Sequence, residues 1–317
     1  MLIQPGPEPA CLERCDNRLQ LPGFPLIECV PNFSEGHDAR KIEAIAAEIT
    51  RAGAAVLRTE SDVDHNRSVI TFAGVPAVMR EAAFRAIARA SELIDLRSHQ
   101  GVHPRLGAAD VVPFVPLSGA SLEECVRIAH DVGARVWDSL RIPVYFYESA
   151  ALRPEAKRLE QVRRGQFEAP EMPPDLGGPS LHASAGATIL GARKILVAFN
   201  INLNSADIRI ARRIAKKVRA AGGGLPCLKA LGVFLASRNL AQVSMNLTDT
   251  AVTTPQAAFD AVLAEAEAEG VSIRSTQLIG LIPAAAVAPE GAAFRLCEDF
   301  GPHRILEHCL KAAFQLP

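Results

Sequence analysis

The sequence predicts an α+β fold of two related halves, because one order of strand and helix patterns occurs twice along the chain. The second half has strand patterns at 194–203, 228–235, 240–247 and 271–278, and helix patterns at 205–220 and 254–269. The order strand, helix, strand, strand, helix, strand is the split βαβ order of a ferredoxin-like unit. The first half begins with this order and then adds elements. We therefore expect two ferredoxin-like subdomains, 26–194 and 195–317, that meet near Arg193.

Apolar spacing and breaking residues define the elements of the first half. A short apolar strand at 26–30 ends at Pro31, and Asp38 opens a helix whose isoleucines recur at core spacing. By the same criteria we expect strands at 54–57, 68–73, 110–115 and 143–147, and helices at 76–93 and 121–136. Residues 160–191 are rich in proline and glycine and predict a long irregular crossing, and such loops are often functional.

Composition excludes several classes of function. The 317 residues carry a net charge of −1, which provides no overall field for nucleic acid or an anionic membrane. No apolar run has the length of a spanning helix, and the first 25 residues lack the basic start and apolar stretch of a signal peptide. We therefore expect a cytoplasmic protein with no nucleic-acid or membrane partner, and a loose N-terminal extension at 1–25.

Two pairs of residues have the spacing of metal ligands, and neither makes a complete site. Cys11 and Cys15 lie four residues apart, but no second pair follows to complete a tetrahedral zinc site. His99 and His103 are also four apart, but Gly101 between them favours a loop over a helix face. The sequence therefore predicts no metal.

The loop at 93–113 is the strongest candidate for chemistry, because it contains two histidines, two arginines and two aspartates. His103 has a side chain suited to proton transfer near neutral pH. A histidine that bonds to backbone in a turn is the commoner structural role. Asp62, Asp64 and Asp110 are carboxylates that could orient the imidazole, and the sequence leaves the choice among them open.

Two predicted strands carry a stripe of uncharged polar side chains opposite an apolar face. Asn200 and Asn202 alternate with apolar residues at 199, 201 and 203, and Gln242 and Ser244 alternate with apolar residues at 243 and 245. Such a stripe is either a solvated outer face or the lining of a polar cleft. Asparagine is disfavoured in ordinary strands, and this favours the lining of a polar cleft.

Four segments of the chain resemble the glutamate formiminotransferase family, which acts with tetrahydrofolate in histidine breakdown. They are ECVPNFSEG (28–36), HPRLGAAD (103–110), GATILGARK with AFNINL (186–203), and NLAQVSMNL (239–247). They occur in the family's order and at similar spacing, and the resemblance covers about residues 26–285.

The resemblance implies two ferredoxin-like subdomains whose sheets face a folate-binding cleft or tunnel. It implies that His103 is the catalytic base, that tetrahydrofolate is a co-substrate, and that no metal takes part. The folate contacts it implies run along Gly178, Pro179, Ser180, Leu181, His182, Ala183, Ser184, Ala185 and Gly186, with Asn32, Asn200, Asn202, Gln242 and Ser244 as further candidates. Animal members have an aromatic residue where this chain has Ala185, and their loop is one residue longer.

The implied reaction transfers the formimino group of N-formimino-L-glutamate to position 5 of tetrahydrofolate, giving 5-formiminotetrahydrofolate and glutamate. Arg67 or Arg105 could hold a glutamate carboxylate in a two-bond fork. The chain ends at Pro317, so we expect a separate cyclodeaminase in the pathway, and we expect a homodimer. Two alternatives remain: a folate-dependent transferase or ligase with another formimino or formyl donor, and a non-catalytic folate-binding module.

Overall fold

The computed structural model describes residues 24–288, 291–297 and 299–316. These residues form a mixed α and β structure with two separate sheets, as the sequence predicts. The expected N-terminal extension lies almost wholly outside the described residues. Among the helices of the described part, none is long and apolar enough to cross a membrane.

The first sheet has seven strands, in the order β3, β4, β1 with β2, β5, β7, β6. Strands β1 and β2 lie between β4 and β5 and run antiparallel to both, whereas β5, β7 and β6 are parallel neighbours. The strands are β1 (Ile27–Cys29), β2 (Asn32–Phe33), β3 (Ala55–Asp62), β4 (Arg67–Gly74), β5 (Ala109–Pro116), β6 (Val144–Glu148) and β7 (Thr188–Ala192).

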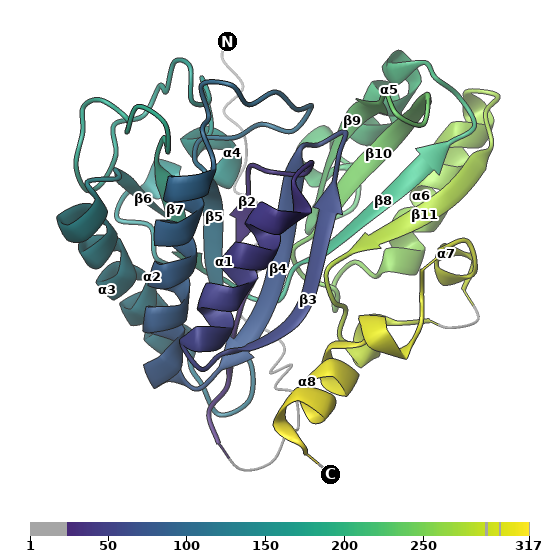
Figure 1. The fold of residues 1–317 in the computed structure, drawn as a ribbon. Coiled ribbons are helices and arrows are strands. Elements are labelled where there is room, and N and C mark those ends of the chain that lie inside the picture. Colours follow the sequence, from purple (N-terminus) through teal and green to yellow (C-terminus); the bar gives the residue numbers. More distant parts are fainter. Residues whose placement is uncertain (1–23, 289–290, 298, 317) are drawn as a thin grey trace.

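Three long helices cover one face of this sheet: α1 (Ala39–Arg51), α2 (Pro76–Leu93) and α3 (Leu122–Leu140) (Figure 1). Their starts follow local rules, since Asp38 and Ser121 cap the first and third helix with side-chain oxygens and proline opens the second. Buried aliphatic and aromatic side chains such as Ile45, Phe72 and Phe114 form the core beneath the helices. The crossing after β6 holds the short helices η1 (Pro154–Lys157) and α4 (Leu159–Val162).

The second sheet has four strands, in the order β11, β8, β10, β9, and every neighbouring pair is antiparallel. The strands are β8 (Val197–Leu203), β9 (Leu228–Leu235), β10 (Leu240–Leu247) and β11 (Ile273–Ile279). Helices α5 (Ile208–Val218) and α6 (Pro255–Ala268) cover one face, and η2 (Ala220–Gly222) follows α5. The faces without helices turn towards each other, so the two sheets form the inner layers of the molecule (Figure 1).

The C-terminal segment ties the two sheets together at one end. It contains η3 (Ala284–Ala286), α7 (Ala292–Arg295), η4 (Pro302–Arg304) and α8 (Leu306–Phe314). Leu306 and Leu310 of α8 pack with Leu26 and Val115 of the first half and with Leu281, which follows β11. This small apolar cluster joins α8 to the first sheet and to the residue after β11.

The predicted irregular crossing at 160–191 is wrong at its C-terminal end, because β7 begins at Thr188. Strand β7 inserts between β5 and β6 and is buried along its whole length. A five-residue strand buried on both faces has no polar and apolar alternation, so periodicity could not distinguish it from loop or helix.

Candidate functional site

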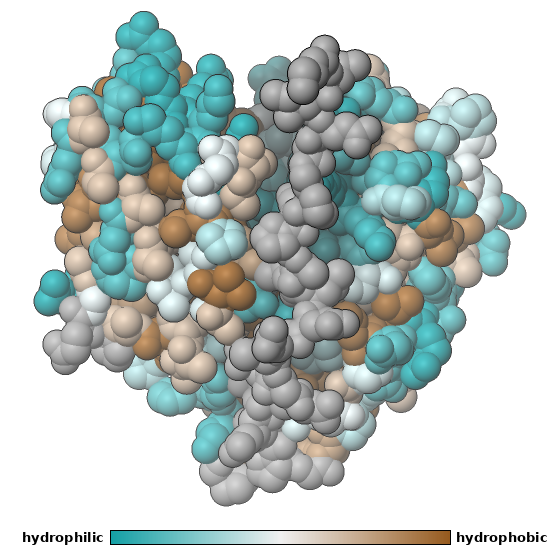
Figure 2. Space-filling model, turned by 180° about the vertical axis from the view of Figure 1, so that it is seen from behind, coloured by the Kyte–Doolittle hydropathy of each residue, from teal (hydrophilic) through white to brown (hydrophobic). Residues whose placement is uncertain are grey.

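A cavity of about 220 Å³ lies between the inner faces of the two sheets. We call it the inter-sheet cleft, and Figure 2 shows hydrophilic surface in the hollow between the two halves. The first sheet and its loops contribute Asn32, Glu60, Asp62, His65, Arg67, His103, Tyr147, Arg163 and Arg193, and the second sheet contributes Asn200, Ser244, Asn246 and Gln277. Six lining residues that the two halves bring together were therefore candidates from the sequence: Asn32, Asp62, Arg67, His103, Asn200 and Ser244.

His103 lies half-buried at the wall of the cleft, and its Nδ1 is 2.8 Å from the carbonyl oxygen of Pro104. Because a carbonyl can only accept, Nδ1 carries the proton and Nε2 keeps its lone pair. Burial, followed by the positive charges of Arg67 and Arg163, holds the pKa of His103 well below its usual 6.5. The imidazole is thus neutral at pH 7 and has a free basic nitrogen.

The loop that carries His103 is held close to the turn between β3 and β4. The amide of Val102 donates to the carbonyl of Asp64, at 3.2 Å. At Gly101, a Cβ would lie only 2.4 Å from the backbone oxygen of His65, so a residue with a side chain would push the loop away. This close approach explains why glycine stands two positions before the histidine.

Asp110 is fully buried behind the cleft and joins two arginines. One of its oxygens accepts from Nη1 of Arg67 at 2.7 Å and from Arg163, and the other accepts from the amide of Leu106 at 2.8 Å. Burial alone would raise the pKa of Asp110, but Arg163 and Arg67 outweigh it and hold the value at about 2. Nε of Arg67 also donates to the side chain of Asn32, at 2.9 Å.

The three carboxylates predicted to orient His103 all bond elsewhere in the described part of the chain. Asp62 accepts from the backbone and the ring of His65, at 2.8 and 2.9 Å. Asp64 accepts from the amide and the hydroxyl of Ser237, at 2.8 and 2.6 Å, and so bridges to the β9–β10 hairpin. Asp110 bonds to the two arginines. The carbonyl of Pro104, and none of these carboxylates, fixes the ring of His103.

Arg105 does not line the cleft. Its guanidinium is nearly buried and forks onto Glu168, with N–O distances of 2.7 and 3.0 Å, while its Nε donates to the ring of His99 at 3.0 Å. That guanidinium already has a carboxylate partner from its own chain. Its role in substrate binding stays a prediction, whereas Arg67 lies where a cleft ligand would meet it.

The polar stripes of β8 and β10 face the cleft rather than outer solvent, which decides between the two possibilities. Ser244 pairs with Asn200 across the strands, and Gln242 pairs with Asn202. Asn200 and Ser244 line the cavity, while Asn202 and Gln242 are fully buried and bond to each other at 2.9 Å. Gln277 of β11, which the sequence analysis missed, lies beside Asn200 and also lines the cleft.

The nine residues 178–186, predicted to contact folate, form a loop outside the cavity lining. Residues 178–180 are exposed, and His182 and Gly186 exchange two backbone hydrogen bonds of 2.9 Å. The carbonyls of Ser184 and Ala185 accept from Leu96 and Ala108, so the loop braces both flanks of the segment that carries His103. Contact between this loop and folate stays a prediction.

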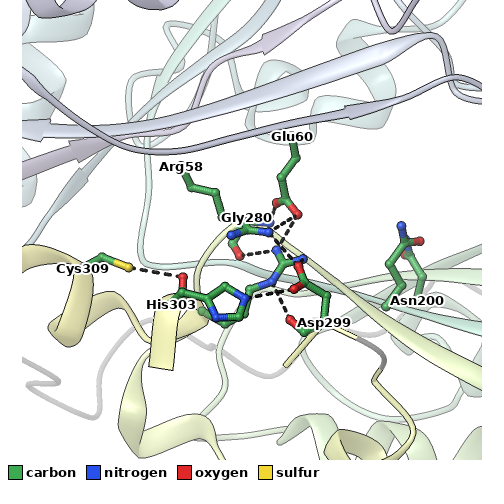
Figure 3. A network of polar contacts seen from close by, with 9 residues as sticks. Arg58, Glu60, Asn200, Gly280, Asp299, His303 and Cys309 are labelled. Carbon is green, nitrogen blue, oxygen red and sulfur yellow. Dashed lines mark hydrogen bonds and ion pairs between the residues drawn. The ribbon is translucent and has the colours of Figure 1, made fainter. Parts of the chain in front are cut away.

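Glu60 of β3 is fixed at the wall of the cleft by a network from the C-terminal segment (Figure 3). Its carboxylate accepts from Arg304, from Arg58 and from the amide of Gly280, which follows β11. Arg304 also bonds to Asp299. Since β3 and β11 are edge strands of different sheets, this network joins the two halves beside the cleft.

Two cationic lining residues were missed by the sequence analysis. Arg163 follows α4 inside the crossing predicted as irregular, and Arg193 lies just after β7 at the junction of the halves. Neither has a local motif, although Arg193 belongs to a segment that resembles the family. Among the described residues, no group of three or more histidine, cysteine or acidic side chains could hold a metal ion.

Family models and individual relatives point to the same family for this chain. Residues 26–193 match the formiminotransferase domain, N-terminal subdomain, and residues 198–299 match the formiminotransferase domain. The glutamate formimidoyltransferase of Streptococcus pyogenes serotype M1 is 42% identical over 294 residues, which covers 90% of this chain and 98% of the relative. The glutamate formimidoyltransferase of Thermoplasma acidophilum is 41% identical over 298 residues, covering 91% and 98%.

A longer relative matches over about half of its length. The formimidoyltransferase-cyclodeaminase of Mus musculus is 42% identical over 283 residues, which covers 85% of this chain and 52% of the relative. The resemblance drawn from the four sequence segments is confirmed by these matches, and the chain belongs to the formiminotransferase family.

Proposed function

We propose that this protein transfers the formimino group of N-formimino-L-glutamate to N5 of tetrahydrofolate, giving 5-formiminotetrahydrofolate and glutamate. The family assignment and the names of the two relatives matched over nearly their whole length support this activity. The observation that carries the mechanism is the position of His103, with a neutral ring and a free Nε2 at the wall of a polar cleft.

The cleft between the two sheets is the proposed folate site. The strand orders support two ferredoxin-like units. In the first half β1 lies between β4 and β5, in the second half β8 lies between β10 and β11, and all four pairings are antiparallel. The reduced pterin presents neutral donors and acceptors along its edge. Amide and hydroxyl groups such as those of Asn200, Ser244 and Gln277 can match both kinds of group.

His103 is the proposed base and then the acid. N5 of tetrahydrofolate attacks the formimino carbon. As the bond from N5 to that carbon forms, the carbon–nitrogen double bond opens onto its nitrogen, and Nε2 of His103 takes the proton from N5. The imidazolium then gives this proton to the glutamate nitrogen as the double bond re-forms and the bond from carbon to the glutamate nitrogen breaks. A depressed pKa favours the second step, because the protonated ring is a stronger acid than a free histidine.

The cleft also contributes by holding both substrates together. Placing N5 and the formimino carbon in contact converts a bimolecular reaction into one within a complex, which is worth several orders of magnitude in rate. The arginines of the cleft supply the positive charge that a substrate carboxylate needs. No metal is part of the proposed mechanism.

The direct test mixes the purified protein with formiminoglutamate and tetrahydrofolate. The product is followed by its conversion in acid to the absorbing methenyl form. Signal from the wild type and its loss in His103→Gln, with an unchanged thermal unfolding midpoint, would support both the reaction and the base. A silent wild type that still binds tetrahydrofolate would contradict the proposal and favour another donor or a binding module.

The setting of the reaction follows from the same proposal. We place the protein in the cytoplasm and expect a homodimer, with a cyclodeaminase activity that consumes the product. Sedimentation of the purified protein tests the homodimer, and a monomer at working concentration would contradict it.

A further inference from the structure

Three arginines of the first half converge on the inter-sheet cleft from separate segments. Arg67 begins β4, Arg163 follows α4, and Arg193 follows β7, and all three line the cavity. We call this group the arginine cluster. Because the three segments are far apart in sequence, only the fold creates this concentration of positive charge.

The acidic groups nearby do not neutralise the arginine cluster. Asp110 is a single carboxylate shared by Arg67 and Arg163, and it is fully buried, so a ligand in the cleft meets the arginines rather than the acid. The two carboxylates that do line the cleft have other partners: Glu60 bonds to Arg304 and Arg58, and Asp62 bonds to His65.

Arg163 and Arg193 keep donors for a ligand. The side chain of Arg163 is 12% exposed, and its Nε is buried with no partner among the described residues. Nη1 of Arg193 donates to the backbone oxygen of Lys194 at 2.9 Å, and the Arg193 side chain also interacts with Tyr147. Glu28 and Glu148 are acidic neighbours of Arg193. Burial raises the pKa of both, that of Glu28 to about 7, so the Glu28 carboxyl is only partly ionised near neutral pH.

The arginine cluster has two parts with different neighbours. Arg67 and Arg163 both act on the pKa of His103, whereas Arg193 and Arg163 both act on the pKa of Tyr147, another lining residue. Arg67 and Arg163 share the carboxylate of Asp110 and form one part of the cluster, whereas Arg193, whose Nη1 bonds to the carbonyl of Lys194, forms the other. A ligand with two carboxylates, one near its reacting nitrogen and one farther away, fits this arrangement.

We propose that Arg163 and Arg67 hold the α-carboxylate of the formimino donor and that Arg193 holds its distal carboxylate, so the cleft selects an α-amino dicarboxylate. This inference rests on the proposed function and names the residues that choose the donor. The α-carboxylate is attached to the carbon that bears the reacting nitrogen, and so belongs beside His103. Loss of the distal carboxylate leaves Arg193 without an acceptor, which is how such a site rejects other donors.

The test pairs a change in the enzyme with a matching change in the donor. Wild type, Arg193→Gln and Arg163→Lys are assayed with N-formimino-L-glutamate, with its γ-carboxamide and with its α-carboxamide. Arg163→Lys keeps a cation beside Asp110 but loses the fork. Arg164→Gln is the matched control, because Arg164 is the exposed neighbour outside the cleft.

With the wild type, we expect the γ-carboxamide to lower kcat/KM by about 10- to 100-fold, the usual value of a charge-assisted pair. Arg193→Gln should lose a similar factor with N-formimino-L-glutamate and almost nothing further with the γ-carboxamide. Arg163→Lys should likewise lose activity with N-formimino-L-glutamate and almost nothing further with the α-carboxamide, so the two losses should not add. The KM for tetrahydrofolate should stay within about twofold of wild type, as should every constant of Arg164→Gln.

Two results would overturn the inference. Equal losses with all three donors would show that neither arginine senses a donor carboxylate. A raised KM for tetrahydrofolate alone would assign the cluster to the glutamate of folate instead. Both results presuppose an active wild type, so they are distinct from failure of the proposed function, which an inactive wild type would reveal.

Discussion

The Nδ1 of His103 lies 2.8 Å from the carbonyl oxygen of Pro104, the next residue in the chain. A hydrogen bond to an adjacent carbonyl fixes both the ring orientation and the tautomer without a carboxylate partner. The basic nitrogen is therefore available in the free protein, and its basicity is set by burial and by Arg67 and Arg163.

Replacing His103 should remove the chemistry and leave binding in place. His103→Gln should lower kcat by about 10²- to 10⁴-fold, the usual contribution of a general acid or base, with both KM values within a few-fold of wild type. His37→Gln, a change at an exposed histidine outside the cleft, is the control and should be normal. Steady-state kinetics of both variants check this prediction. Near-normal turnover in His103→Gln would contradict the role of His103 as general base and acid.

The pH dependence of kcat/KM should reveal the depressed pKa of His103. The neutral ring is the base, so kcat/KM should hold as pH falls towards 6.5 and decline only at lower pH. Removing a nearby cation should raise this pKa, so Arg163→Gln should shift the acid limb to higher pH. Profiles of kcat/KM for both proteins test this, and an unmoved limb would mean that Arg163 does not act on the ring.

Glu28 should make the protein less stable as pH rises. Burial raises its pKa from 4.5 to about 7, so the folded state binds the extra proton between these values. The protonated Glu28 carboxyl therefore makes its full contribution to the free energy of unfolding below pH 4.5. This contribution is lost as pH rises through about 7, and the total loss is roughly 3 kcal/mol. Glu28→Gln should remove this loss and be more stable than wild type at pH 8.

Urea unfolding at pH 5 and pH 8 measures the effect of Glu28. The control is Glu43→Gln, because Glu43 is an exposed residue of α1. Wild type and this control should lose stability in parallel between the two pH values. A Glu28→Gln variant with the same pH dependence as wild type would contradict a raised pKa.

Breaking the bond between Arg304 and Glu60 should destabilise the junction of the two sheets. Arg304→Met leaves Glu60 at the cleft wall and Asp299 without their shared partner, and we expect a loss of about 3 kcal/mol in the free energy of unfolding. Adding Glu60→Gln should recover part of it, because Glu60 would otherwise keep only Arg58 as an ion-pair partner at the cleft wall. Urea titration of both variants measures this, and additive losses would show that the pair is not coupled.

The sequence was sufficient for features that depend on local rules. Alternation along β8 and β10 predicted which side chains share the polar face, because strand geometry turns successive side chains to opposite faces. The loop of His103 was found from its density of ionisable residues next to glycine and proline. Strand β7 escaped prediction, because a short apolar strand buried on both faces has no period.

The cationic partners of the site escaped prediction for a different reason. Arg163 and Asp110 are separated by 53 positions, and Arg304 and Glu60 by 244, so no window along the chain contains either pair. The family resemblance indicated the reaction but not these contacts. The prediction that Asp62, Asp64 or Asp110 orients His103 depended on the same missing information.

By itself, the sequence determined the order of the main elements apart from β7, the family, and the histidine most suited to proton transfer, because periodicity, breaking residues and motifs are encoded in short segments. The tertiary structure decided which charges surround that histidine, which arginines face the cleft, and that Arg105 bonds to Glu168 instead. Those outcomes depend on how two sheets and a C-terminal segment pack, and packing brings together residues that no local rule connects.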